Sequence, residues 1–176
     1  IRNERPEVPT FTEIETDISG GYSIVPTLDD LYTLFSIDRA RGYVYTINPL
    51  TKEKKRVSNI TLPKIIDVYA SESGAYIVIR SFGENDIIES RIINLRELND
   101  DGSIKESGVV RLPDGIQDVI MTSELYFLRT TSLDGSEIVR GALPYNPNVS
   151  NPLTTLWTSP LHNWDIQKAG GASIVI

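Results

Sequence analysis

The chain of 176 residues has no cysteine and only one histidine and one methionine. The absence of cysteine excludes disulfide scaffolds, zinc ribbons and thiolate chemistry. Basic side chains are also outnumbered, since 17 Lys and Arg stand against 24 Asp and Glu. Because clustered cations bind the phosphate backbone of nucleic acids, a net charge of −7 argues against a nucleic-acid partner.

Long apolar runs are missing as well. No stretch approaches the ~18 apolar residues of a transmembrane helix, and no signal peptide is recognisable. The nearest basic cluster is formed by Lys52, Lys54, Lys55 and Arg56. It follows the turn-forming Asn48-Pro49, so we interpret it as the solvated tip of a hairpin. Because the chain starts at Ile1 and ends on the apolar run 172–176, we expect both of its ends to be incomplete.

The sequence divides into two regions. Residues 1–21 are rich in proline and acidic side chains and end at Gly20-Gly21, which predicts a linker, although residues 10–14 could instead pair as an edge strand. Residues 22–176 contain short segments rich in Val, Ile, Tyr and Thr, separated by clusters of Gly, Pro, Asn and Asp. This pattern predicts an all-β domain with more than ~40% strand and almost no helix.

An internal repeat is the most informative feature. A phrase with Pro near its start and Asp-Val or Asp-Ile near its end occurs at residues 62–68, 112–119 and, more loosely, 159–166. Its aspartates, Asp67, Asp118 and Asp165, stand 51 and 47 residues apart. A small or polar turn and a second apolar strand follow each copy. A period near ~50 residues with four short strands is typical of a β-propeller blade.

The predicted fold is therefore a series of four-stranded antiparallel propeller blades, present here in part. We expect a first, partial blade at residues 31–58, complete blades at 62–111 and 112–158, and the start of a fourth. Such a segment would leave one blade face uncovered at each end. A β-sandwich is the alternative, since it also has short strands at even spacing, but it does not require the phrase to recur in phase.

With these residues in view, the chain resembles β-propellers with degenerate hairpin turns, such as those of the Tol system and of dipeptidyl peptidases. Residues 41–47, 57–63 and 159–164 are similar to a family of uncharacterised envelope proteins of candidate-phyla bacteria. The likeness covers residues 31–176. It implies an exterior propeller, on the extracellular or periplasmic face, behind a membrane segment outside this chain. That family has no established activity, so the resemblance supplies no catalytic residue.

His162 is the only histidine, so a Ser-His-Asp triad or a histidine metal site would have to include it. No Gly-x-Ser-x-Gly turn accompanies it, and we interpret it as a loop residue. Trp164-Asp165 does not fit a WD repeat, because it opens a strand and no Gly-His precedes it. The hypothesis for Asp67, Asp118 and Asp165 is structural: they accept backbone hydrogen bonds at the blade junctions.

One segment partly follows the calcium-loop pattern of alternating oxygen side chains. It contains Glu97, Asn99, Asp101 and Gly102, but Glu97 replaces the first Asp and Gly108 replaces the bidentate Glu. We therefore predict a hairpin loop with an Asx turn instead of a calcium site.

Paired carboxylates could support glycoside hydrolysis, and Glu84, Asp86 and Glu89 are the nearest set. They surround a loop, which favours a solvated hairpin. The segment Ser132-Leu-Asp134-Gly135 lacks the spacing of a sialidase Asp box, and the sequons at Asn59 and Asn148 carry little information.

The sequence assigns no catalytic, cofactor-binding or metal-binding residue. The hypothesis for function is a non-catalytic binding or scaffolding propeller with a protein or glycan partner at a cell envelope. The alternative is the propeller of a peptidase or glycosidase whose catalytic residues lie outside this segment.

Overall fold

The computed structural model describes residues 19–26, 32–58, 60–131, 135–149, 152–160, 166–169 and 173–175. Of these residues, 55% lie in strands and none in an α-helix, which confirms the prediction of an all-β fold. Two 3₁₀ turns, η1 (Glu84–Asp86) and η2 (Glu106–Gly108), are the helical elements of this part of the chain. No helix in the described ranges is long and apolar enough to cross a membrane.

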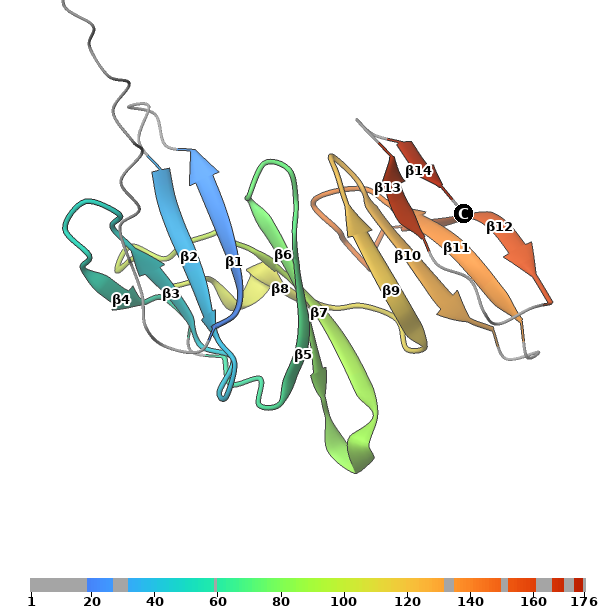
Figure 1. Ribbon diagram of the computed structural model, residues 1–176, viewed down its shortest axis with the longest axis horizontal. Coiled ribbons are helices and arrows are strands. Elements are labelled where there is room, and N and C mark those ends of the chain that lie inside the picture. The colour runs from blue at the N-terminus through green and yellow to red at the C-terminus, as the bar shows by residue number, and fades with distance from the viewer. Residues whose placement is uncertain are drawn as a thin grey trace, which may run out of the picture.

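The strands form three consecutive four-stranded antiparallel sheets in which strand order follows chain order (Figure 1). Blade 1 contains β1 (Ser19–Pro26), β2 (Tyr32–Asp38), β3 (Val44–Ile47) and β4 (Lys54–Arg56). Blade 2 contains β5 (Ile65–Ala70), β6 (Tyr76–Phe82), β7 (Ile88–Asn94) and β8 (Val109–Arg111). Blade 3 contains β9 (Ile116–Met121), β10 (Leu125–Thr130), β11 (Ser136–Gly141) and β12 (Leu153–Ser159). A two-stranded sheet of β13 (Gln167–Ala169) and β14 (Ser173–Val175) follows.

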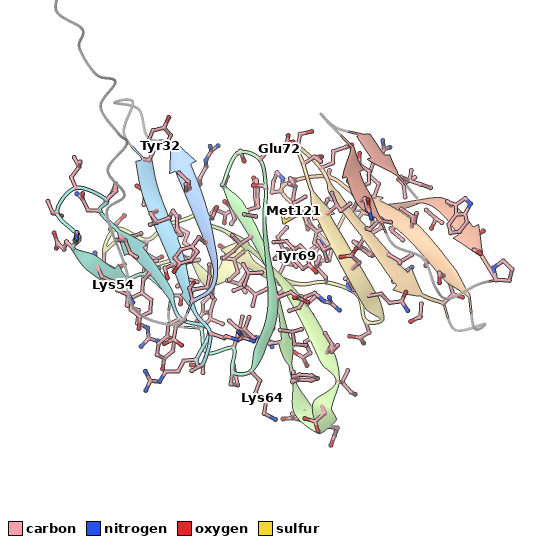
Figure 2. All side chains as sticks on the ribbon, viewed as in Figure 1. Tyr32, Lys54, Lys64, Tyr69, Glu72 and Met121 are labelled. Carbon is pink, nitrogen blue, oxygen red and sulfur yellow. The ribbon has the colours of Figure 1, made fainter. Side chains whose placement is uncertain are left out.

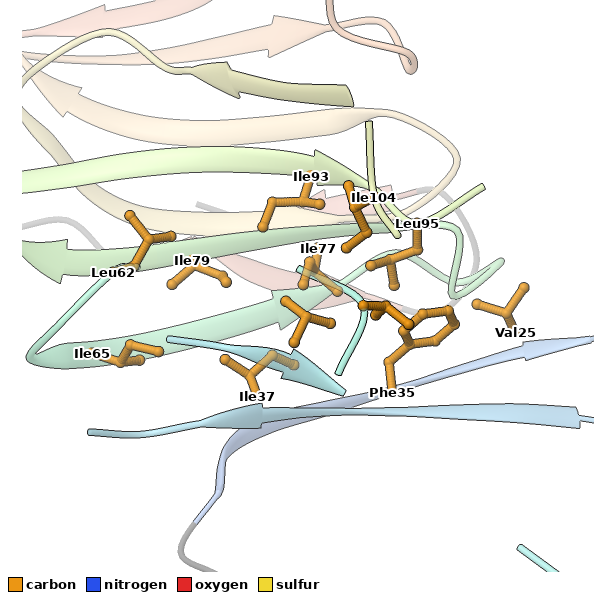
Figure 3. Close-up of a cluster of buried hydrophobic side chains, with 12 residues drawn as sticks. Val25, Phe35, Ile37, Leu62, Ile65, Ile77, Ile79, Ile93, Leu95 and Ile104 are labelled. Atoms are coloured by element: carbon orange, nitrogen blue, oxygen red, sulfur yellow. The ribbon is translucent and has the colours of Figure 1, made fainter. Parts of the chain in front are cut away.

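The three sheets stack face to face and none of them is closed, an arrangement compatible with propeller blades or with the alternative, a β-sandwich. Blade 2 is covered on both faces. Ile77 and Ile79 of β6 point into a core shared with Phe35 and Ile37 of blade 1 (Figure 3). Val78, between them in the same strand, points into a second core that blade 3 completes. Successive side chains of a strand face opposite sides, so a continuous apolar run such as 76–79 is suited to this middle sheet.

A bulge at the same place in each first strand confirms the repeat. The pairing register shifts between Ile65 and Asp67 in β5 and between Ile116 and Asp118 in β9. Asp67 and Asp118 therefore occupy equivalent positions, each directly after its bulge. Asp165, the third member of the predicted set, lies outside the described residues.

Blade 1 differs from its sequence-based description. It is four-stranded, because β1 pairs with β2 ahead of the predicted start of the blade. Ser19, Gly20 and Gly21, which were expected in the linker, belong to this strand. Gly21 follows the β1 bulge and thus holds the position of Asp67 and Asp118. A Cβ atom at Gly21 would lie only 2.5 Å from Cβ of Val68, so glycine permits the close approach of β1 to β5.

Candidate functional site

A groove of about 780 Å³ lies between blade 1 and the turn that follows β7. This volume falls within the ~300–1,000 Å³ that is usual for ligand pockets. Four of its lining side chains are almost completely buried and apolar: Phe35, Ile47, Val57 and Leu95. They are part of the protein interior, so the base of the groove is rigid and apolar.

The first wall of the groove is the turn between β3 and β4. The Oδ1 atom of Asn48 accepts hydrogen bonds from the backbone N–H groups of Leu50, at 2.9 Å, and Thr51, at 3.1 Å. This Asx turn fixes the loop and presents Leu50 to solvent. The Leu50 side chain is 81% exposed, and Tyr32, at the start of β2, is 59% exposed (Figure 2). Two large apolar groups therefore stand at the rim without cover.

The second wall is the loop between β7 and β8 of blade 2. Leu98 forms an isolated bridge with Ile104, which places Leu98 and Gly102 along the groove. The ammonium group of Lys55 donates to the Asp101 carbonyl at 2.7 Å, and this bond joins the two walls. Arg96 also lines the groove, and its exposed guanidinium makes no ion pair with another described residue. The site thus combines an apolar base with cationic groups at its edge.

A separate polar network joins blade 2 to blade 3. Arg80, which is 6% exposed, donates from Nη1 to Asp67 at 3.1 Å and from Nη2 to the Ile116 carbonyl at 3.0 Å. Tyr69 lies between the two blades (Figure 2), and its hydroxyl donates to Asp118 at 3.4 Å. Burial raises the pKa of Tyr69, and a hydrogen bond with Arg80 opposes that rise.

Asp67 and Asp118 both lie at this junction, but they accept hydrogen bonds from different kinds of donor. Asp118 accepts the backbone N–H of Val119 at 2.8 Å, in keeping with the expected backbone contact. Asp67 instead accepts from the side chain of Arg80. Because Arg80 also reaches the backbone of the next blade, these groups connect neighbouring sheets.

The calcium-like segment forms the predicted hairpin loop. Oδ1 of Asp101 accepts the backbone N–H of Ser103 at 2.8 Å, which is the expected Asx turn. Hydrogen bonds with Ser103 also lower the pKa of the Asp101 carboxyl group. The amide of Asn99 donates to the Ser103 hydroxyl at 2.8 Å, and Glu97 accepts from Asn94 at 2.8 Å. The side chains of Glu97, Asn99 and Asp101, which the calcium-loop pattern would use as ligands, therefore take part in local hydrogen bonds.

The three candidate glycosidase carboxylates are distributed around the β6–β7 hairpin. Glu84 and Asp86 belong to η1 at its tip, and Asp86 pairs with Lys64 at 3.4 Å. Glu89 pairs with Arg91 at 3.0 Å and lies 3.6 Å from Arg111. No group of three potential metal ligands occurs in the described ranges. The remaining sequence candidates, His162, Trp164, Asp165, Ser132, Asp134 and Asn59, lie outside those ranges.

Sequence reasoning did not predict the groove. Its lining residues extend from Val25 to Gly102 and come together only when blades 1 and 2 stack. The sequence feature that could have indicated the groove is the basic cluster beside Asn48-Pro49, which we interpreted as a solvated hairpin tip. No protein-family model and no curated protein matches the chain. The groove geometry is accordingly the basis on which a function can be proposed.

Proposed function

We propose that this chain is a non-catalytic binding module of a β-propeller that holds an apolar segment of a protein partner. The observation that carries this proposal is the groove, with its buried apolar base and the exposed Leu50 and Tyr32 at its rim. Tyrosine is enriched among the residues that dominate binding energy in protein interfaces. The base of the groove is formed by buried apolar side chains, which favours a peptide with apolar side chains over a glycan.

We also propose a location at the cell envelope. This part of the proposal rests on the resemblance of residues 31–176 to envelope propellers, and the acidic composition of residues 1–18, with Pro6 and Pro9, would suit a stalk. Proteinase treatment of intact cells that carry the natural protein tests it: an exterior module is degraded, whereas an interior one survives until the cells are lysed.

Selection of peptides on the 1–176 protein tests the binding function directly. We expect selected peptides to carry large apolar residues and to bind at least tenfold more weakly to Leu50→Asp. Leu50 is 81% exposed, so this substitution leaves the core intact. Ile87→Asp is the matched control, because Ile87 is 55% exposed on the β6–β7 hairpin and does not line the groove. Equal binding by both variants would refute the groove as the site.

A second experiment distinguishes the binding module from the alternative, a propeller that belongs to a hydrolase. The natural full-length protein would be treated with an activity-based serine-hydrolase probe and assayed on glycoside substrates. Covalent labelling or glycoside turnover would favour the alternative, whereas a protein that binds peptides and shows neither activity supports the binding module.

A further inference from the structure

The charged side chains that line the groove are distributed unequally between its two walls. Glu53 is exposed and belongs to the first wall, at the end of the turn between β3 and β4. Arg96 is exposed and belongs to the second wall. Lys55 of β4 also lines the groove, and its ammonium group reaches the second wall at the Asp101 carbonyl. Two cations thus stand against one carboxylate, and the second wall is the cationic side of the groove.

Arg96 differs from most of the described arginines because it has no carboxylate partner. The arginines that lie within 4.0 Å of a carboxylate of this chain are Arg41, Arg80, Arg91, Arg111, Arg129 and Arg140. Arg56 instead stacks on the ring of Tyr43. Arg39 and Arg96 make no ion pair with a described residue, and of these two only Arg96 lines the groove. In a chain with a net charge of −7, this leaves a cation available to an acidic partner.

The loop between β7 and β8 holds Arg96 beside the apolar base of the groove. Oδ1 of Asn94 accepts the backbone N–H of Arg96 at 3.1 Å, and the backbone N–H of Leu95 donates to the Ala75 carbonyl at 2.8 Å. Leu95 is part of the buried base, and Leu98 lies along the same wall. The N–H donors of the Arg96 guanidinium make no hydrogen bond to a described residue. A ligand whose apolar side chain fills the base therefore brings its neighbouring residue close to unused donors.

We propose that the peptide bound by this groove carries an aspartate or glutamate next to its apolar anchor, and that Arg96 binds the side-chain carboxylate. This inference rests on the proposed function of the groove as a peptide-binding site. The planar guanidinium matches a carboxylate in a bidentate pair. Glu53 repels a carboxylate at the first wall, so the acidic residue of the peptide lies toward the loop between β7 and β8. Because the pair is exposed to solvent, it adds specificity more than affinity.

A double-mutant cycle between protein and peptide tests the pairing. A peptide with an acidic residue, selected on the 1–176 protein and amidated at its C-terminus, is compared with the same peptide in which glutamine or asparagine replaces that residue. We expect the neutral peptide to bind the natural chain about threefold more weakly or worse, and the difference to vanish on Arg96→Gln. Selected peptides that lack acidic residues, or a difference that persists on Arg96→Gln, would overturn the proposal.

Arg39→Gln is the matched control and should retain the full difference between the two peptides. Arg39 is exposed like Arg96, and β2 leads from Tyr32 at the groove to Asp38, so Arg39 lies at the far end of that strand. Both substitutions are at exposed positions, and circular dichroism verifies that the variants are folded. An equal loss on both variants would show a general effect of protein charge and would also overturn the pairing.

Charge reversal and salt provide a second readout. Arg96→Glu should prefer a peptide with lysine in place of the acidic residue. Raising the salt concentration from about 0.1 M to about 1 M shortens the Debye length from about 10 Å to about 3 Å, so it should weaken the acidic peptide more than the neutral one. Binding that Leu50→Asp weakens but that does not depend on the acidic residue would refute the pairing and leave the proposed function standing. A protein that binds no peptide would refute both.

Discussion

The guanidinium of Arg80 bonds to Asp67 in its own blade and to the Ile116 carbonyl in the next blade, at 3.1 and 3.0 Å. The two acceptors differ in their access to water. The Asp67 side chain is 43% exposed, so its charge is partly solvated and the ion pair alone adds little to stability. The bond to the Ile116 carbonyl is buried, so water replaces it less readily than it replaces the ion pair. Arg80 therefore acts mainly as a connection between blades.

Replacing Arg80 with methionine is expected to lower the free energy of unfolding by about 1–3 kcal/mol, because the buried Ile116 carbonyl loses its donor. This loss of stability is partly offset, because the substitution also removes Nε of Arg80. That buried atom has no hydrogen-bond partner among the described residues. Asp67→Asn should lower the free energy of unfolding by less, because the Asp67 side chain is half-exposed. Urea denaturation measures both values. An Asp67→Asn variant that is less stable than Arg80→Met would show that the ion pair, and not the inter-blade bond, dominates.

The glycine at the β1 bulge is expected to be sensitive to added volume. In Gly21→Ala the new Cβ would lie 2.5 Å from Cβ of Val68, so one of the two strands must shift. Overpacking of this kind costs about 1–3 kcal/mol. Gly20→Ala is the neighbouring control, because its Cβ would lie 3.1 Å from the Ile65 side chain, which can move by a few tenths of an ångström. Thermal unfolding of both variants should show the larger loss for Gly21→Ala.

Much of the fold could be predicted from the sequence because its signals are local. Val- and Ile-rich segments between turn residues define the strands, and the repeated Asp67 and Asp118 define equivalent positions. The first strand was missed because Gly20-Gly21 has the composition of a linker. The need for glycine there arises from Val68, a residue of another blade. The groove was missed for the same reason, since Tyr32 and Leu98 become neighbours only through blade stacking.

Stability is expected to fall above pH 10, where unfolded tyrosine ionises. The pKa of Tyr126 is raised above its ordinary value, first because its hydroxyl donates to Glu124 at 2.7 Å and then by burial. The unfolded chain therefore loses this proton at lower pH than the folded chain, which favours unfolding as the pH rises from 10 towards the folded pKa. Burial raises the pKa of Tyr69 and Tyr145 in the same direction. Tyr126→Phe should show a shallower decline in urea midpoint between about pH 9 and pH 11.

Glu124→Gln tests independently whether the hydrogen bond to Glu124 causes the raised pKa of Tyr126. It removes the carboxylate that accepts from Tyr126 and leaves the ring in place. We expect this variant to lose part of the pH dependence that Tyr126→Phe loses. An unchanged slope in both variants would show that Tyr126 does not contribute to the decline.

Calcium is expected to have no effect on the melting temperature, because the loop at 97–108 supplies its own hydrogen-bond partners. A ligand that binds only the folded state must raise its stability, so a calcium site would produce a dose-dependent rise. Asp101 accepts the Ser103 N–H at 2.8 Å, and this bond already uses one oxygen that a calcium ion would require. Asp101→Asn retains an acceptor oxygen for this turn and removes the charge, so it separates the two roles. We expect calcium and a chelator to leave the melting temperatures of both the natural chain and Asp101→Asn unchanged. A rise of several degrees in the natural chain that Asp101→Asn abolishes would establish a calcium site in this loop.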